Sequence, residues 1–330
     1  MQLMPVPELG HLTYCTNIHA GETWPEVLSS LRRHLPPIKA EVAPGQRLGV
    51  GLRLSAIAAE ALDGTEAFAE LGRLLQEGGY YVFTINGFPY GRFHGQPVKE
   101  GAYRPDWSTK ERLDYTNRLA DLLAALLPDG LVGSVSTVPG TFKPWADGRV
   151  EAIVDNLIRH VAHLLALEER SGRTIVLALE PEPHCLLETI EETIRFFEQR
   201  CFAGPTVGRL ADLSGLTKAA AADALRRHLG VCYDVCHAAV EFEDPRTSIA
   251  GLKAAGIGIA KLQLSCALKV PRVDARSRER LGAFDEPVYL HQVVARQDGR
   301  LSRFLDLPDA LAAAADQETA EWRIHFHVPI

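Results

Sequence analysis

Short apolar runs alternate with longer amphipathic stretches along the whole chain of 330 residues. In the amphipathic stretches, apolar residues recur at spacings of three and four, which predicts helices. The apolar runs are nearly continuous, as is typical of parallel strands covered on both faces. Eight strands are predicted, at residues 12–18, 47–54, 80–86, 130–137, 174–180, 230–235, 259–265 and 322–328. This alternation predicts an α/β fold, a TIM (β/α)8 barrel that forms a single domain over residues 1–330.

Two features depart from an ideal barrel. Residues 285–306 hold an Asp-Gly turn between two apolar runs, which predicts a β-hairpin inserted before the last strand. The chain also ends at Ile330, directly after the last predicted strand, where a closed barrel normally has a helix. We therefore expect the final helix to be absent, because the chain is truncated or because another element covers the gap. Apolar surface exposed there would favour a homodimer.

The formal net charge is −7, and only short basic pieces such as residues 276–280 interrupt the acidic balance. A nucleic-acid partner calls for a basic face, so the composition counts against one. No apolar stretch reaches the ~18–20 residues of a membrane-spanning helix, and the N-terminus lacks the pattern of a secretory signal. We therefore expect a cytoplasmic protein without a membrane span. The six cysteines form no CxxC pair, so we expect them to be reduced and mostly packed.

Polar side chains gather where the predicted strands end, and in a barrel of this type the chemistry lies at those ends. They come from strands 1, 5, 6, 7 and 8: Asn17, His19, Glu180, Glu182, Asp234, His237, Lys261, Gln263, His325 and His327. Structural roles stay open for some of them. A carboxylate such as Glu182 can cap a helix or form an ion pair at the rim. His325 and His327 share one face of a strand and can instead point into the helix layer.

A cation is the simplest way to accommodate this set of side chains. Glu180, Asp234 and buried imidazoles at one barrel mouth would repel one another or titrate unless a cation neutralised the carboxylates. Oxygen and imidazole donors without thiolates suit Mn²⁺, Mg²⁺, Co²⁺ or Zn²⁺. Asp234 and His237 lie three residues apart, so both face the mouth only if the strand breaks after Val235. The sequence therefore predicts a divalent-metal site at the strand ends.

At these positions the chain resembles the xylose isomerase-like TIM-barrel superfamily, which includes sugar isomerases, sugar-phosphate epimerases and endonuclease IV. The resemblance implies a metal-binding glutamate at Glu180. It also implies a D-x-x-H pattern, met by Asp234 as a ligand and by His237 as a second ligand or a substrate contact. The sequence departs from the superfamily on strand 7, where Gln263 replaces a histidine, and on strand 8, where histidines replace a glutamate.

Four stretches are more specifically similar to the EboE family of metabolite traffic proteins, which are bacterial members of that superfamily. They read TYCTNIHAGETW, TINGFPYGRFHG, STVPGTFKPW and LALEPEPHCLLET. The family is encoded in gene clusters implicated in handling or exporting a secondary-metabolite precursor. The resemblance thus implies a barrel fold, a metal site and a role with a small molecule.

The predicted loop after strand 3, residues 86–107, is long and concentrates aromatic and basic side chains. Such residues over a polar barrel mouth are typical of a lid over a small, partly apolar ligand, although they can also pack a small core for the loop itself. The predicted ligand contacts, from this loop and its neighbours, are Asn17, His19, Phe88, Tyr90, Arg92, His94, Trp145 and His325.

We therefore expect a metal-dependent isomerase or epimerase that acts on a small secondary-metabolite precursor. The metal would polarise a carbonyl or enediolate oxygen, with Glu180, Asp234, Gln263 and His327 as the expected ligands. Glu182, His237 or Lys261 would move the proton. One alternative is a metabolite carrier without catalysis. A metal phosphodiesterase like endonuclease IV is disfavoured, because its trinuclear site needs histidines that predicted strands 2 and 3 lack.

Overall fold

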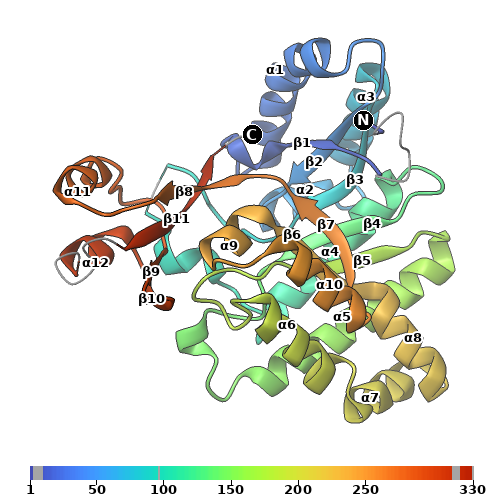
Figure 1. The fold of residues 1–330 in the computed structure, drawn as a ribbon. Helices are drawn as coiled ribbons and strands as arrows, with labels where there is room; N and C mark the ends of the chain where they lie inside the picture. The colour runs from blue at the N-terminus through green and yellow to red at the C-terminus, as the bar shows by residue number, and fades with distance from the viewer. Residues whose placement is uncertain (3–9, 96, 314–319, 329–330) are drawn as a thin grey trace.

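A curled sheet of seven parallel strands forms the main body of the protein in the computed structural model, which describes residues 1–2, 10–95, 97–313 and 320–328 (Figure 1). The strands follow one another in chain order across the sheet. They are β1 (Thr13–Cys15), β2 (Leu48–Arg53), β3 (Tyr80–Asn86), β4 (Gly133–Thr137), β5 (Ile175–Leu179), β6 (Leu229–Asp234) and β7 (Gly258–Gln263). Each lies within one residue of a predicted strand or inside it, which confirms the α/β class and the parallel reading of the apolar runs.

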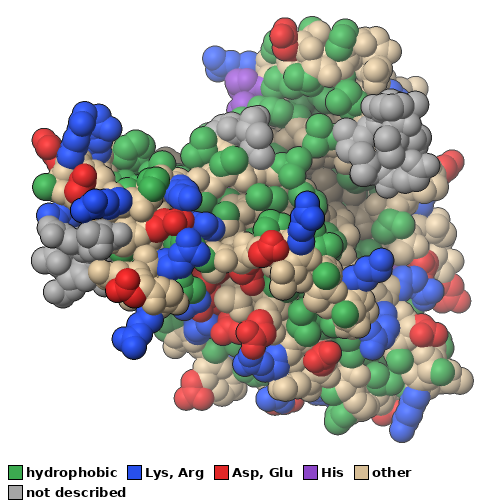
Figure 2. Space-filling view, in the orientation of Figure 1, with side chains coloured by type: hydrophobic (Ala, Val, Ile, Leu, Met, Phe, Trp, Pro, Cys, Tyr) green, Lys and Arg blue, Asp and Glu red, His purple; other side chains and the backbone are tan. Residues whose placement is uncertain are grey.

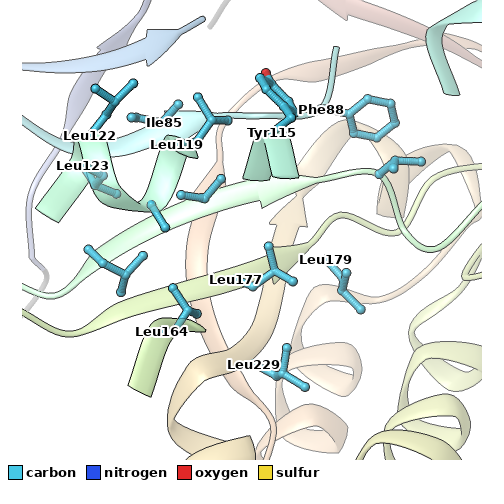
Figure 3. Packing of buried hydrophobic residues seen from close by; sticks show 14 of the residues in the cluster. Ile85, Phe88, Tyr115, Leu119, Leu122, Leu123, Leu164, Leu177, Leu179 and Leu229 are labelled. Atoms are coloured by element: carbon cyan, nitrogen blue, oxygen red, sulfur yellow. The ribbon is translucent and has the colours of Figure 1, made fainter. Parts of the chain in front are cut away.

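Helices follow the strands, and most of them cover the outer face of the sheet. They are α1 (Trp24–Val42), α2 (Ala56–Leu62), α3 (Glu66–Gly78), α4 (Lys110–Leu126), α5 (Val150–Ser171), α6 (Ile190–Phe196), α7 (Gly204–Ser214), α8 (Lys218–His228), α9 (Val235–Val240) and α10 (Pro245–Ala254). Short helical turns are η2 (Thr16–Ile18), η3 (Lys99–Tyr103), η4 (Lys143–Trp145) and η5 (Phe197–Cys201). The main core lies between these layers, where side chains such as Leu119 of α4, Ile85 of β3 and Leu177 of β5 are fully buried (Figure 3).

The remaining strands form a second, antiparallel sheet in the order β10-β9-β11-β8. Its elements are β8 (Cys266–Val270), α11 (Ala275–Gly282), β9 (Val293–Gln297), β10 (Arg300–Phe304), α12 (Leu307–Ala312) and β11 (Glu321–Val328). β9 and β10 are joined by Asp298 and Gly299, whose φ angles of 51° and 77° are those of a tight hairpin turn. The predicted hairpin is therefore confirmed.

The last predicted strand belongs to this second sheet, so the prediction of a closed eight-stranded barrel is wrong for the described residues. β11 pairs antiparallel with β8 and β9, and β1 and β7 are the edges of the parallel sheet. The chain passes from β7 through residues 264–265 directly into β8, without a helix between them. β8 lies outside the parallel sheet, and β11 forms its hydrogen bonds with β8 and β9 instead of closing the barrel between β7 and β1. Trp322 and Ile324 of β11 are fully buried in a separate apolar cluster of this second sheet.

The outer face of β7 is partly uncovered, because no helix follows β7 before the chain enters β8. Leu262 and Leu264 are 48% and 55% exposed, and Ile18 in η2 is 64% exposed. Figure 2 shows this face, with hydrophobic side chains across its centre and charged side chains of both signs around them.

The homodimer, the absence of a nucleic-acid partner and the single domain stay predictions. The chain end at Ile330 lies outside the described residues. No described helix is long and apolar enough to cross a membrane.

Candidate metal centre

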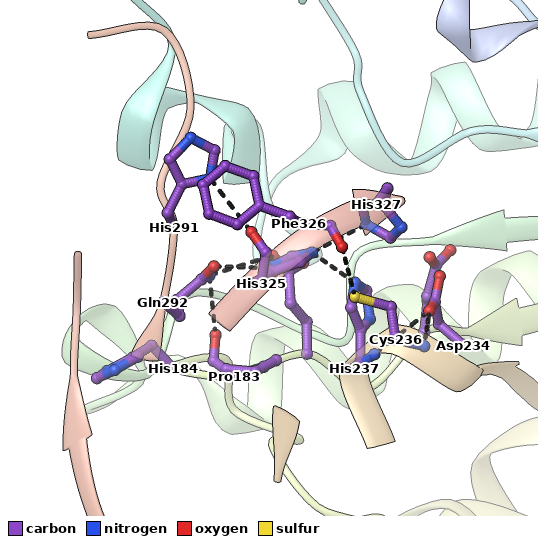
Figure 4. Close-up of polar contacts among 12 residues, drawn as sticks. Pro183, His184, Asp234, Cys236, His237, His291, Gln292, His325, Phe326 and His327 are labelled. Carbon is purple, nitrogen blue, oxygen red and sulfur yellow. Dashed lines mark hydrogen bonds and ion pairs between the residues drawn. The ribbon is translucent and has the colours of Figure 1, made fainter. Parts of the chain in front are cut away.

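Three imidazole rings converge between the two sheets (Figure 4). His237 comes from α9, and His325 and His327 come from β11. The Nε2 atom of His325 lies 3.1 Å from Nε2 of His237 and 2.9 Å from Nε2 of His327. His237 and His325 are buried, whereas His327 is exposed at the rim. We call these residues the histidine triad.

Local structure explains how His237 reaches this place. Asp234 ends β6 and caps α9, because its Oδ1 accepts hydrogen bonds from the backbone N–H groups of Cys236 (2.7 Å) and His237 (3.3 Å). The chain therefore turns into a helix directly after Asp234, and His237 lies in the first turn of α9. The strand was predicted to break into a loop after Val235. In the structure it ends one residue earlier, at Asp234, and a helix rather than a loop follows.

Hydrogen bonds fix the protons of the two buried rings. Nδ1 of His237 lies 2.8 Å from the carbonyl oxygen of Pro181, and a carbonyl only accepts. The ring therefore carries its proton on Nδ1 and has a lone pair on Nε2. Nδ1 of His325 lies 2.6 Å from Oε1 of Gln292, which likewise accepts. His327 places its Nδ1 3.0 Å from the hydroxyl of Ser265.

A cation fits the resulting arrangement. Two Nε2 lone pairs face each other at 3.1 Å, and adding a proton is unfavourable because burial lowers the pKa of His237 and holds that of His325 well below its usual range. Two nitrogens on a tetrahedral zinc ion, at bonds of ~2.0–2.1 Å, lie roughly 3.3 Å apart. Ligand atoms of Glu182, Asp234 or Cys236 each lie within 4.8 Å of two triad nitrogens. Imidazole and carboxylate donors of this kind, with their outer N–H groups held by acceptors, are typical of a divalent-metal centre.

The three nearby carboxylates are tuned differently. Burial raises the pKa of Glu182 to about 8, although hydrogen bonds from the Tyr103 hydroxyl (2.9 Å) and Gln292 Nε2 (3.3 Å) oppose the shift. Burial raises the pKa of Glu180 to about 7, with Lys261 opposing and Asp234 adding to it. For Asp234, burial acts in the same direction, but the neighbouring imidazoles and the two capping N–H groups lower its pKa overall. Asp234 is therefore the most fully ionised of the three carboxylates at neutral pH.

Lys261 and Gln263 project from β7 toward these carboxylates. Nζ of Lys261 donates to the hydroxyl of Ser136 at 3.0 Å. Burial would lower the pKa of Lys261, but the surrounding acidic groups, Cys232 and Glu180 first, raise it overall. Nε2 of Gln263 donates to Oδ2 of Asp234 and, at 3.3 Å, to Oε1 of Glu180. Gln263 thus bridges two carboxylates as a donor.

Some predicted contacts form a second polar group near the start of the chain. Nε2 of His19 lies 2.8 Å from the hydroxyl of Tyr14, and the His19 ring stacks on that of His34 at 3.8 Å. Asn17 accepts from the thiol of Cys15 and lies beside His94, whose pKa is lowered by burial. Among the described residues, no hydrogen bond or ring contact joins this group to the histidine triad. The structure therefore brings Glu180, Glu182, Asp234, His237, Lys261, Gln263, His325 and His327 together. Asn17, His19 and His94 make no such contact with the histidine triad, although Cys15, the partner of Asn17, lies near enough to Lys261 to raise its pKa.

The aromatic residues of the long loop pack against one another or against rings of neighbouring segments. Phe88 makes an edge contact with Tyr103 (6.1 Å between ring centroids), and Tyr90 makes one with Tyr115 (5.0 Å). Trp145 lies under the guanidinium of Arg104, 4.2 Å from the ring centroid. These contacts favour a structural role for the aromatic residues, the alternative that the sequence left open, but the packing also involves α4 and η4 and is not confined to the loop. The ligand contacts predicted for Phe88, Tyr90, Trp145 and the exposed Arg92 stay predictions.

Three further residues complete the site, and the sequence analysis assigned a role to none of them. Gln292 precedes β9, and its amide contacts both Glu182 and His325. Tyr103 drew notice only as a loop aromatic, although its hydroxyl donates to Glu182. Ser265 lies in the link between β7 and β8. No spacing in the sequence links Gln292 or Tyr103 to the strand ends, so neither could be assigned to the site from the pattern of strands.

Comparison with solved structures finds remote likenesses. An IolI protein with a bound zinc atom is 15% identical over 63% of this chain, with a TM-score of 0.34, and the chain spans 60% of that protein's length. The 3-keto-D-glucoside 4-epimerase YcjR from E. coli, in its apo form, is 14% identical over 71% of this chain and 87% of its own, with a TM-score of 0.33. Protein SMc04130 from Sinorhizobium meliloti 1021 is 14% identical over 66% and 78%, with a TM-score of 0.29. No protein-family model and no curated protein matches the chain.

Proposed function

We propose that this protein is a divalent-metal-dependent enzyme that isomerises or epimerises a small hydroxy-carbonyl compound. The observation that carries the proposal is the histidine triad, in which two buried rings turn their Nε2 lone pairs toward each other at 3.1 Å beside buried carboxylates. His237, His325 and His327 would hold the metal, with Asp234 or Glu182 as the carboxylate ligand. This set differs from the predicted ligands Glu180, Asp234, Gln263 and His327. Gln263 is left out because its amide nitrogen donates hydrogen bonds to Glu180 and Asp234.

The donor set also bears on the metal. Imidazole nitrogens suit Zn²⁺ and Co²⁺ better than Mg²⁺, which prefers oxygen ligands and water. When bound, such an ion polarises a carbonyl oxygen and so makes the adjacent C–H more acidic. The choice of metal and of substrate remains part of the proposal, as does the metabolite-traffic role implied by the EboE resemblance.

Glu180 is the proposed proton-transfer group. Its pKa of about 7 leaves it partly ionised at neutral pH, so it can accept a proton and return it in the same turnover. Lys261 remains protonated between Ser136 and the carboxylates, where its charge would favour a negatively charged intermediate. Glu182 is protonated at neutral pH unless a metal ion replaces its proton.

Hydrogen exchange at carbon tests the enzyme proposal before the natural substrate is identified. The protein, loaded with Zn²⁺, Co²⁺ or Mn²⁺, is incubated in D₂O with a panel of small polyhydroxylated ketones and aldehydes, and NMR follows loss of the α-C–H signal. We expect exchange that falls by about 100-fold or more in Glu180→Gln, since general bases contribute on this scale. Glu66→Gln is the matched control, because Glu66 is 81% exposed on α3.

The opposite result is equally informative. If the metal-loaded protein exchanges no hydrogen in any compound of the panel, or if Glu180→Gln exchanges as fast as the wild type, the proposed reaction is wrong. Saturable binding of a panel compound without exchange would instead favour the metabolite-carrier alternative.

A further inference from the structure

The amide group of Gln292 forms hydrogen bonds to four residues around the histidine triad. Its side chain is fully buried, directly before β9. The amide nitrogen donates to the Tyr103 hydroxyl (2.9 Å), to Glu182 Oε1 (3.3 Å) and to the carbonyl oxygen of Pro183 (3.3 Å). The amide oxygen lies 2.6 Å from Nδ1 of His325. The backbone carbonyl of Gln292 also accepts from the backbone N–H of His325 at 2.9 Å.

These contacts allow only one orientation of the amide. The carbonyl of Pro183 can accept but cannot donate, so the amide nitrogen must face it. A flipped amide would place its oxygen against that carbonyl, which would leave the buried carbonyl oxygen of Pro183 without its donor. The amide oxygen therefore faces His325 and accepts the proton of Nδ1. His325 is then left with a lone pair on Nε2, directed at His237 and His327.

We propose that Gln292 is a positioning residue of the metal centre, which holds His325 in the tautomer and orientation that a metal ligand needs. The inference rests on the metal site of the proposed function. In metal sites, acceptors for the outer N–H of a histidine ligand fix the ring and make the ligand nitrogen more basic, and their loss typically lowers metal affinity by about 10- to 100-fold. Gln292 can act in this way because hydrogen bonds to Tyr103, Glu182 and Pro183 fix its amide nitrogen. The amide group therefore cannot rotate, and its oxygen stays directed at His325.

The same contacts join three segments that lie far apart in the sequence. Tyr103 belongs to η3 in the long loop, Glu182 follows β5, and His325 lies on β11. Gln292 is the residue that bonds to all three through one amide. A merely structural glutamine would satisfy buried groups without governing a ring tautomer, so the tautomer of His325 distinguishes the two roles.

The test combines a ring spectrum with metal affinity. Long-range ¹H–¹⁵N spectra of the metal-free protein at pH 8 report which ring nitrogen carries the proton, and His325→Ala identifies the signals of that ring. Zn²⁺ affinity is measured by competition with a chromophoric chelator. Gln292→Met keeps the length of the side chain without its hydrogen bonds, and Gln76→Met on the exposed face of α3 is the control. Circular dichroism and thermal unfolding show that each variant is folded.

We expect the wild-type His325 ring to carry its proton on Nδ1. Gln292→Met should show a mixture of tautomers and an affinity for Zn²⁺ lower by about 10- to 100-fold, whereas Gln76→Met should match the wild type in both readouts. A proton on Nε2 in the wild type, or unchanged spectrum and affinity in Gln292→Met, would overturn the role of Gln292. If the wild type binds no Zn²⁺, the metal site itself fails, and the ring spectrum then shows separately whether the contact between Gln292 and His325 was assigned correctly.

Discussion

Arg112 of α4 gives a sharp test of how the long loop above the site is held. Its side chain is fully buried, and its guanidinium donates to three backbone carbonyls, those of Pro105 (2.8 Å), Gly87 (2.6 Å) and Phe88 (3.0 Å). These carbonyls belong to both ends of the loop between β3 and α4. Because Tyr103 lies in this loop, Arg112 also supports the hydroxyl that donates to Glu182.

The size of the effect follows from two opposing contributions. Replacing Arg112 with methionine leaves three buried carbonyls without donors, at ~2 kcal/mol each or roughly 6 kcal/mol together. Against this, the wild type bears the cost of burying the guanidinium. Burial lowers its pKa to about 10 from 12.5, which corresponds to roughly 3 kcal/mol. We therefore expect Arg112→Met to lower the free energy of unfolding by about 3 kcal/mol.

Urea unfolding measures this loss, and hydrogen–deuterium exchange of peptides from residues 97–107 reports on the loop. The control is Arg33→Met, which replaces an exposed arginine of α1 and should change stability by less than ~0.5 kcal/mol. An Arg112→Met variant within about 1 kcal/mol of the wild type, with unchanged loop protection, would refute this account of the loop.

Three further outcomes follow from the structure. His160 is fully buried with its Nδ1 2.6 Å from Asn117, and burial holds its pKa well below 6.5. Only the unfolded chain then takes up this proton, so His160 costs stability as the pH falls below the unfolded pKa, by up to ~1.4 kcal/mol per pH unit. Urea unfolding between pH 7.5 and 5.5 should show a shallower loss in His160→Gln, and equal slopes would contradict the shift. Leu119→Ala should lower the free energy of unfolding by about 2–5 kcal/mol, whereas Leu213→Ala, at a residue 59% exposed, should cost under ~1 kcal/mol. Arg303→Met leaves the buried carboxylate of Glu241 without its 2.6 Å partner and should cost about 3–5 kcal/mol. Adding Glu241→Gln should recover part of that loss, and no recovery would show that the ion pair is not the cause.

The parallel sheet could be predicted from the sequence because strands covered on both faces leave a continuous apolar signature. β3 spans residues 80–86, the predicted range. The prediction for the eighth strand was wrong, because the order of strands along the chain does not determine which sheet the last strand joins. Trp322 and Ile324 alternate with Arg323 and His325, and such alternation is typical of a strand with one buried face in an antiparallel sheet. In the structure, Trp322 and Ile324 belong to the apolar cluster of the second sheet, and His325 on the same strand faces His237.

The site was predictable to the extent that parallel strands end at one edge. Glu180 and Asp234 meet for that reason, and the D-x-x-H spacing placed His237 beside them. His325 and His327 reach the same place by another route, through the antiparallel sheet, so their proximity was anticipated from a barrel that does not form. The roles of these residues stay predictions. Gln292 could not be found, since its contact with His325 depends on how the hairpin lies against the parallel sheet.

Metal content is the most direct measurement of the central claim. Protein purified without chelators, and a sample reconstituted with Zn²⁺ or Co²⁺, are analysed by mass spectrometry beside His325→Ala and the control His19→Ala, which removes a histidine outside the triad. We expect about one equivalent of divalent metal in the wild type and in His19→Ala, and little in His325→Ala. No metal in the reconstituted wild type, or equal retention in His325→Ala, would contradict a metal centre built on His237, His325 and His327.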